Sequence, residues 1–148
     1  MKKILLAIIL FVILLATGAV FSFFIPKEIF GSAKIEINGA VLDVEVAETP
    51  LARSRGLSYR EELKDGSGML FIFDDPGVYG FWMKGMKFPI DIVWISGNEI
   101  VAVEENVAPD NGDALYYPPE PVNRVLEIGA GAAKRLKIQD KGKITVIF

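Results

Sequence analysis

The chain has 148 residues, 51% of them hydrophobic, a formal net charge of −3, and neither Cys nor His. Thiol nucleophiles, disulfides, zinc sites of the usual kind and histidine general bases are therefore excluded. Residues 32–148 carry 13 basic against 18 acidic side chains, which argues against a nucleic-acid partner, because such binding needs a basic patch.

The chain begins with a long apolar segment. Lys2-Lys3 precedes the range Ile4–Ile25, which has 22 residues and no charge. As a helix this range would span roughly 33 Å, close to the hydrocarbon thickness of a bilayer. We expect an uncleaved, single-pass membrane anchor over residues 4–25, a short linker to residue 31, and one exported domain over residues 32–148. The alternative is a signal peptide cleaved near Thr17-Gly18-Ala19, which would release a secreted protein.

A β-hairpin is predicted at the start of the exported domain. Residues 34–37 and 41–46 alternate between polar and apolar side chains with period two. Asn38-Gly39 between them is a strong signal for a two-residue turn. We therefore expect two adjacent antiparallel strands over residues 32–46.

A short helix is predicted over residues 49–57. It begins with a capping threonine followed by proline, and a glycine near its end can adopt a positive φ. The helix brings Arg53 and Arg55 close together, with Arg60 just beyond. These arginines are either ordinary solvated charges or a clamp for an anion or carboxylate, for which the guanidinium fork is well shaped.

The range Gly68–Ile95 is the stretch around which the domain is organised. It opens with the apolar run 69–73 and closes with the run 90–95, and it contains both Trp residues. Apolar runs of this length, bounded by Gly and Pro, are typical of strands buried on both faces. We expect these two runs to form the middle of the sheet.

Asp91 interrupts the second apolar run, and a buried carboxylate must be paired or hydrogen-bonded. We expect it to be mostly buried and held either by an arginine of residues 53–60 or by backbone amides. If residues 85–89 form a simple hairpin loop, Asp91 lies opposite Trp82, or opposite Met83 after a slip of one residue. In a functional role, Asp91 would instead line a pocket.

Trp82 and Lys84 fall on one face of their strand by simple alternation. The pair is either a ligand platform or a Trp covered by a lysine stem.

The remaining chain predicts further strands over 99–105, 123–128 and 143–148, a long irregular loop over 106–122 and a short helix over 129–136. Seven or eight short strands with two short helices predict a mostly β (α+β) domain, either barrel-like or a sandwich.

A series of ordered motifs runs through the exported domain. They are Arg53-x-x-Gly56-Leu57, Gly68-Met69-Leu70-Phe71, Trp82-Met83-Lys84, Pro89-Ile90-Asp91, Glu104-Glu105-Asn106-Val107, Val125-Leu126-Glu127 and Gly129-x-Gly131. Together they resemble the domain-of-unknown-function 192 family, also called uncharacterised protein family 0127, over nearly all of residues 34–148. Ser58 and Gly85 depart from the family pattern, which commonly has Met and Asn there. The resemblance implies a compact, mostly β domain behind a signal or anchor, and it implies no reaction.

Two functional interpretations remain open. A carboxylate-based hydrolase of an envelope or carbohydrate substrate would use Asp91, Glu105 and Glu127. We favour a ligand-binding or protein-interaction module, because the usual catalytic groups are absent. Its partner would be a small anionic ligand, a carbohydrate or an envelope protein, and we expect no cofactor, no metal and a monomeric domain. The candidate ligand-binding residues are Arg53, Arg55, Trp82, Lys84, Asp91, Glu105 and Glu127.

Overall fold

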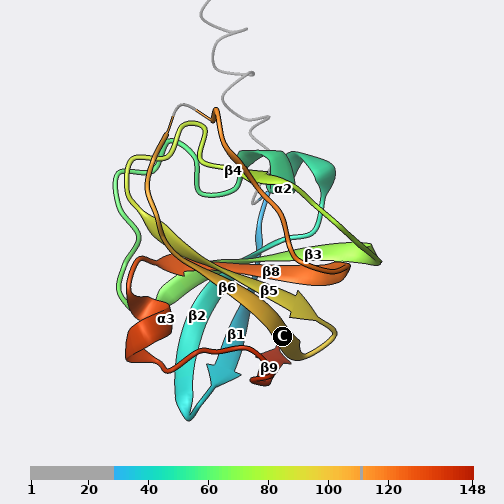
Figure 1. Ribbon diagram of the computed structural model, residues 1–148. Helices are drawn as coiled ribbons and strands as arrows, with labels where there is room; N and C mark the ends of the chain where they lie inside the picture. Colours follow the sequence, from blue (N-terminus) through green and yellow to red (C-terminus); the bar gives the residue numbers. More distant parts are fainter. Residues whose placement is uncertain (1–28, 111) are drawn as a thin grey trace, which may run out of the picture.

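The computed structural model describes residues 29–110 and 112–148. These ranges form nine strands and two helices, all of which except β7 are labelled in Figure 1. The strands are β1 (Gly31–Ile37), β2 (Ala40–Ala47), β3 (Ser67–Gly77), β4 (Phe81–Trp82), β5 (Ile90–Ser96), β6 (Glu99–Val107), β7 (Leu115–Tyr116), β8 (Val122–Gly129) and β9 (Ile144–Ile147). The helices are α2 (Pro50–Arg55) and α3 (Ala132–Arg135). The domain is mostly β, as predicted, and the two-residue strands β4 and β7 bring the number of strands above the seven or eight expected.

Seven strands form one sheet in the order β6-β5-β8-β3-β2-β1-β9, and β4 pairs with β7 in a small second sheet. Neighbours in the large sheet are antiparallel except β2 and β3, which are parallel and are joined by the crossover that contains α2. The large sheet curls into a half-barrel (Figure 1). Its two edges approach each other where Glu99 and Lys143 form an antiparallel bridge.

The predicted first hairpin is confirmed. Asn38 and Gly39 both have positive φ, 49° and 80°, as a tight two-residue turn between antiparallel strands requires. Ile37 therefore pairs with Ala40, and the alternation of each strand directs its apolar side chains to one face of the sheet.

The curled sheet carries one hydrophobic cluster on each face. The first cluster joins residues of both edge strands, Ile100 of β6 and Ile144 of β9, and therefore fills the inside of the curl. The second cluster lies on the other face, under α2 and β4, and includes Phe71 and Trp94. Residues 90–95 are buried throughout, which confirms the prediction of a strand covered on both faces.

The predicted hairpin between Trp82 and Asp91 is wrong. β4 pairs with β7, and both edges of β5 are occupied by β6 and β8. Asp91 therefore lies opposite Ile128 of β8, not opposite Trp82 or Met83. The turn after β4 contains Gly85 with a φ of 74°, and it leads the chain away from β4 rather than back along it.

The later strands follow the predictions for 99–105, 123–128 and 143–148, as β6, β8 and β9. The predicted helix over 129–136 is shorter, because Gly131 has a φ of 78° and α3 begins only after it. The irregular loop over 106–122 contains β7, which the sequence pattern did not indicate.

The anchor expected at residues 4–25 lies outside the described residues. Within residues 29–110 and 112–148, no helix has the length and apolar character needed to cross a membrane. Ile29 and Phe30, just before the expected start of the domain at residue 32, already pack against the second cluster.

Candidate functional site

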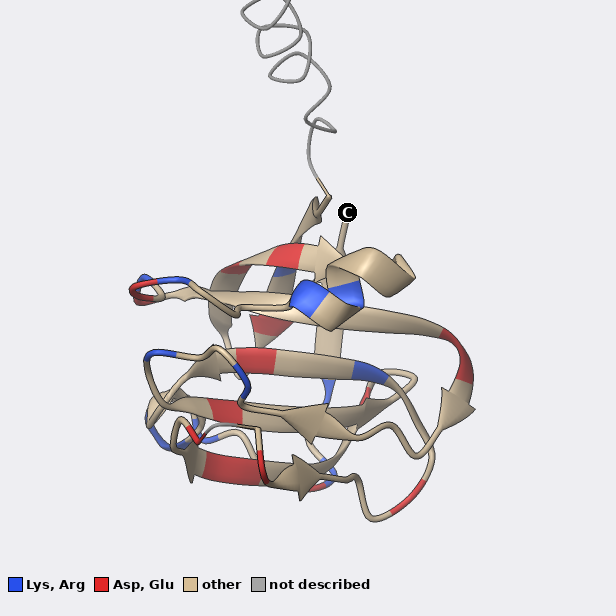
Figure 2. Ribbon diagram, turned by 90° about the horizontal axis from the view of Figure 1, so that it is seen from above, with Lys and Arg blue, Asp and Glu red and all other residues tan. Residues whose placement is uncertain are grey.

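Helix α2 positions two arginines above the second cluster. The side chain of Thr49 caps its first turn, and the helix ends at Gly56 with a φ of 50°. A Cβ atom at Gly56 would lie 3.3 Å from Cζ of Phe71, so glycine allows the end of the helix to approach the sheet closely. Arg53 and Arg55 occupy the last turn, and Figure 2 shows the helix with its basic residues in blue.

A cleft of about 220 Å³ lies between α2 and the segment around β4. Its walls are aromatic. The rings of Phe73 and Tyr79 stack with their centres 3.7 Å apart, and Phe81 meets Phe71 edge to face at 4.9 Å. Trp82 also lines the cleft. The walls can therefore hold a flat or apolar part of a ligand.

The two arginines of α2 differ in their surroundings. Nη1 of Arg53 donates hydrogen bonds to the carbonyl oxygens of Glu48 and Ile72 at 2.5 and 2.9 Å. Its guanidinium lies 4.9 Å from the centre of the Phe73 ring, so Arg53 is a fixed part of the wall. Arg55 is exposed and forms no ion pair with the described residues. Its guanidinium is therefore available to an anion.

Glu127 of β8 contributes a carboxyl group to the lining of the cleft. Its neighbours across the sheet are Met69 and Ile92, both fully buried apolar residues. The side chain is 5% exposed, and Oε2 is buried without a hydrogen-bond partner among the described residues. Burial raises the pKa of Glu127 to about 8, against an opposing effect of the Arg60 charge. The group is therefore mostly protonated at neutral pH and can donate a hydrogen bond.

The charge of Arg60 acts on this carboxyl group, but its guanidinium is held by another partner. Its Nη1 and Nη2 atoms donate to Oε1 and Oε2 of Glu45 at 2.5 and 2.9 Å. The hydrogen bond with Glu45 raises the pKa of Arg60. Both side-chain hydrogen bonds of Arg60 go to Glu45, and the carboxyl group of Glu127 accepts none from this arginine.

Trp94 carries a second unpartnered polar atom on the same face of the sheet. Its indole Nε1 is buried and has no hydrogen-bond partner among the described residues. Trp94 follows Ile92 by two residues on β5, and Ile92 lies directly opposite Glu127. Buried polar atoms without partners are rare. Here two of them, Oε2 of Glu127 and Nε1 of Trp94, belong to adjacent strands and the same face of the sheet.

The cleft brings together four of the seven residues predicted from sequence. These are Arg53, Arg55, Trp82 and Glu127. Lys84 is exposed just after β4, and Glu105 is exposed on β6; neither lines the cleft.

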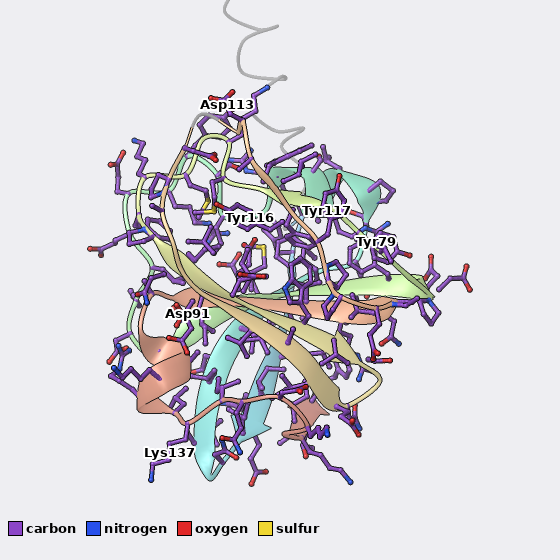
Figure 3. All side chains as sticks on the ribbon, in the orientation of Figure 1. Tyr79, Asp91, Asp113, Tyr116, Tyr117 and Lys137 are labelled. Carbon is purple, nitrogen blue, oxygen red and sulfur yellow. The ribbon has the colours of Figure 1, made fainter. Side chains whose placement is uncertain are left out.

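Asp91 lies on the other face of the sheet, opposite Ile128 of the first cluster. It is fully buried, and its two carboxylate oxygens accept hydrogen bonds from the backbone N–H groups of Asn106 and Ala133, both at 2.8 Å. Figure 3 shows it beside α3. Of the two expected partners, backbone amides hold it and the arginines do not. It ties the end of β6 and the start of α3 to β5.

Sequence reasoning did not single out the aromatic walls as part of a site. Phe71 and Phe73 lie two positions apart in the sequence, as do Tyr79 and Phe81, so each pair falls on one face of an extended segment. That repeated spacing is the signal that could have found them.

A wider groove of about 700 Å³ lies beside β1 and β2. Four of its charged side chains form ion pairs, Lys34 with Asp43 at 2.7 Å and Arg60 with Glu45. A ligand would have to compete with these pairs, so the aromatic cleft is the better candidate. Across residues 29–110 and 112–148, no three acidic side chains are grouped so that they could hold a metal ion.

Comparisons with known proteins place the chain among uncharacterised relatives. The DUF192 family model, described as "Uncharacterized ACR, COG1430", matches residues 33–146. A crystal structure from Sinorhizobium meliloti 1021, described as a candidate transcription regulator, is 30% identical with a TM-score of 0.75 and covers 81% of this chain and 97% of that chain. A crystal structure of a protein of unknown function from Novosphingobium aromaticivorans DSM 12444 is 28% identical with a TM-score of 0.71. The match covers 78% of this chain and 84% of that chain. No curated protein matches the chain.

Proposed function

The chain belongs to the DUF192 family, and from the aromatic cleft of its domain we propose that it is a binding module for a small organic anion. The observation that carries this proposal is Glu127, a buried carboxyl group with an unpartnered oxygen in the lining of an aromatic cleft. Such a group is costly for the fold unless a ligand uses it.

The charges around the cleft favour an anion. Arg53 and Arg55 line it, and among the described residues Glu127 is the only acidic one in its lining. Because the pKa of Glu127 is about 8, the cleft has a positive charge at neutral pH although the domain as a whole is acidic. The exposed fork of Arg55 suits a carboxylate or a similar planar anion.

The volume and the walls restrict the rest of the ligand. A cleft of about 220 Å³ corresponds to about seven water molecules at ~30 Å³ each. A single-ring aromatic acid or a sugar acid is of this size, and both can stack on the aromatic walls. The protonated carboxyl group of Glu127 would donate a hydrogen bond to an oxygen atom of the ligand.

The alternative of a carboxylate hydrolase receives less support. Paired-carboxylate hydrolysis needs two carboxyl groups at the reacting bond. Of the three carboxylates considered from sequence, Asp91 is on the other face of the sheet and Glu105 is exposed on β6. Glu127 is therefore without a second carboxylate in the lining of the cleft.

We also propose that residues 4–25 anchor the chain in the cell membrane, with the domain outside the cytoplasm. The uncharged length of this segment and the two lysines before it support this location. The binding module would then sample ligands of the cell envelope.

A thermal-shift screen of the full chain in mild detergent tests the binding function. We expect aromatic carboxylates or sugar acids to raise the melting temperature at neutral pH, and their neutral amides to have a smaller effect. A ligand at 100 times its dissociation constant adds about 2.7 kcal/mol to the free energy of unfolding.

The variant Arg55→Gln should weaken this response at least about fivefold in dissociation constant, since it removes the accessible guanidinium. The control is Arg135→Gln, which removes an arginine of α3 that lies outside the lining of the cleft and pairs with Asp65 at 2.7 Å. Equal responses of the two variants, or no response to any anion, would refute the proposal.

A further inference from the structure

Four large apolar side chains are exposed around β4. Tyr59 is 69% exposed, Trp82 49%, Leu115 50% and Tyr117 51%. Single exposed apolar residues are common on protein surfaces, whereas a group of them indicates an interaction site.

Contacts with the segment 80–85 hold these residues in one region. Leu115 pairs with Trp82 across the small sheet. The ring of Tyr117 lies so close to Gly80 that a Cβ atom there would be 2.8 Å from it, and Tyr59 N donates a hydrogen bond to the carbonyl oxygen of Gly85 at 2.7 Å. We call Tyr59, Trp82, Leu115 and Tyr117 the aromatic surface. In Figure 3, Tyr117 lies at the end of the domain near α2, and Lys137 at the opposite end.

The described chain begins beside this surface. Ile29 and Phe30 pack against the second cluster. The guanidinium of Arg60 lies 5.5 Å from the ring centre of Phe30, and Tyr59 is its neighbour in the chain. The start of the domain and the aromatic surface therefore share one side of the molecule.

The length of the preceding chain limits how far this side can be from a membrane. Three residues, 26–28, separate the apolar range Ile4–Ile25 from Ile29. Four residue steps span at most about 14 Å when fully extended. If residues 4–25 lie in the bilayer, Ile29 is within about 14 Å of the end of that segment.

We propose that the aromatic surface docks on the bilayer that holds the anchor. This inference rests on the membrane location proposed above. Trp and Tyr side chains favour the interface between lipid and water, where the ring is buried and the polar atom is hydrated. The short tether keeps the surface at a high local concentration next to the lipid, so contacts of four side chains are sufficient. Because Trp82 also lines the cleft, docking places the mouth of the cleft at the membrane surface.

Tryptophan fluorescence of the full chain in lipid vesicles tests the docking. The chain has two Trp residues, and Trp94 is fully buried, so Trp82 reports on the surface. Lipids brominated near the headgroup should reduce the emission of Trp82. Acrylamide dissolved in the water should reduce this emission less in the vesicle sample than in a sample of the chain without lipid or detergent. The matched control combines Trp82→Phe with Val41→Trp, since Val41 is 55% exposed next to the β1–β2 turn at the other end of the sheet.

Quenching of the wild type by brominated lipid, with none for the control variant, supports docking. Equal quenching of the wild type and the control variant overturns docking. Absence of quenching in both proteins, when they float with the vesicles, also overturns docking. Either result leaves the anchor intact. Shielding of Trp82 from acrylamide without lipid quenching points to a protein partner and also overturns it. Chain that does not float with the vesicles overturns both the anchor and docking, and the thermal-shift response in detergent still decides the binding function.

Discussion

Replacing Glu127 by Gln is expected to stabilise the protein by about 5 kcal/mol at pH 9 and to change its stability little at pH 4. In the wild type, burial raises the pKa of Glu127 from 4.5 to about 8. Between these values the folded state retains a proton that the unfolded state releases. The free energy of unfolding therefore falls as the pH rises through this window, by up to about 1.4 kcal/mol per pH unit, and the loss is complete above pH 8.

Urea unfolding of the two proteins between about pH 4 and pH 10 measures this difference. Trp94 is fully buried and its emission reports on unfolding. Glu104→Gln is the matched control, because Glu104 lies opposite Ile92 on the side away from Glu127 and is exposed. A difference between wild type and Glu127→Gln that does not change with pH would show that Glu127 titrates as an ordinary carboxyl group.

Replacing Asp91 by Ala is expected to destabilise the protein by about 3–5 kcal/mol. The substitution leaves the backbone N–H groups of Asn106 and Ala133 buried without their acceptor. Asp91→Asn should cost about 2–3 kcal/mol, since its amide oxygen can still accept one of the two bonds. Glu105→Ala, at an exposed position of β6, should change the free energy of unfolding by no more than about 0.5 kcal/mol.

The ligand response separates a structural role of Asp91 from a functional one. Because Asp91 faces the first cluster, away from the cleft, the folded Asp91→Asn protein should keep the thermal shift of the wild type. A stable Asp91→Asn protein that no longer responds to the ligand would contradict the structural assignment.

The local elements of the fold could be predicted because their signals lie in adjacent residues. The Asn38-Gly39 turn fixes the first hairpin, and the capping Thr49 with Gly56 fixes the bounds of α2. The pairing of β4 with β7 could not be predicted, since it joins two-residue strands separated by 32 residues of chain between Trp82 and Leu115.

The candidate site could be predicted only in part. Asp91 was expected to be buried because it interrupts an apolar run, but its partners, Asn106 and Ala133, come from elements distant in sequence. The sequence singles out Asp91 among the three candidate carboxylates and not Glu127, whose neighbours give no periodic signal because β8 is buried on both faces at this point. What distinguishes Glu127 is the pairing of Arg60 with Glu45, which only the tertiary structure establishes.

The most direct test of the proposed cleft is a ¹³C NMR titration of the Glu127 carboxyl group in the full chain, free and with an anion found in the thermal-shift screen. In the free protein we predict a midpoint near pH 8. The bound anion should move this midpoint upward, because a negative charge beside the carboxyl group favours its protonated form. An ordinary midpoint near pH 4.5, unchanged by the anion, would contradict the account.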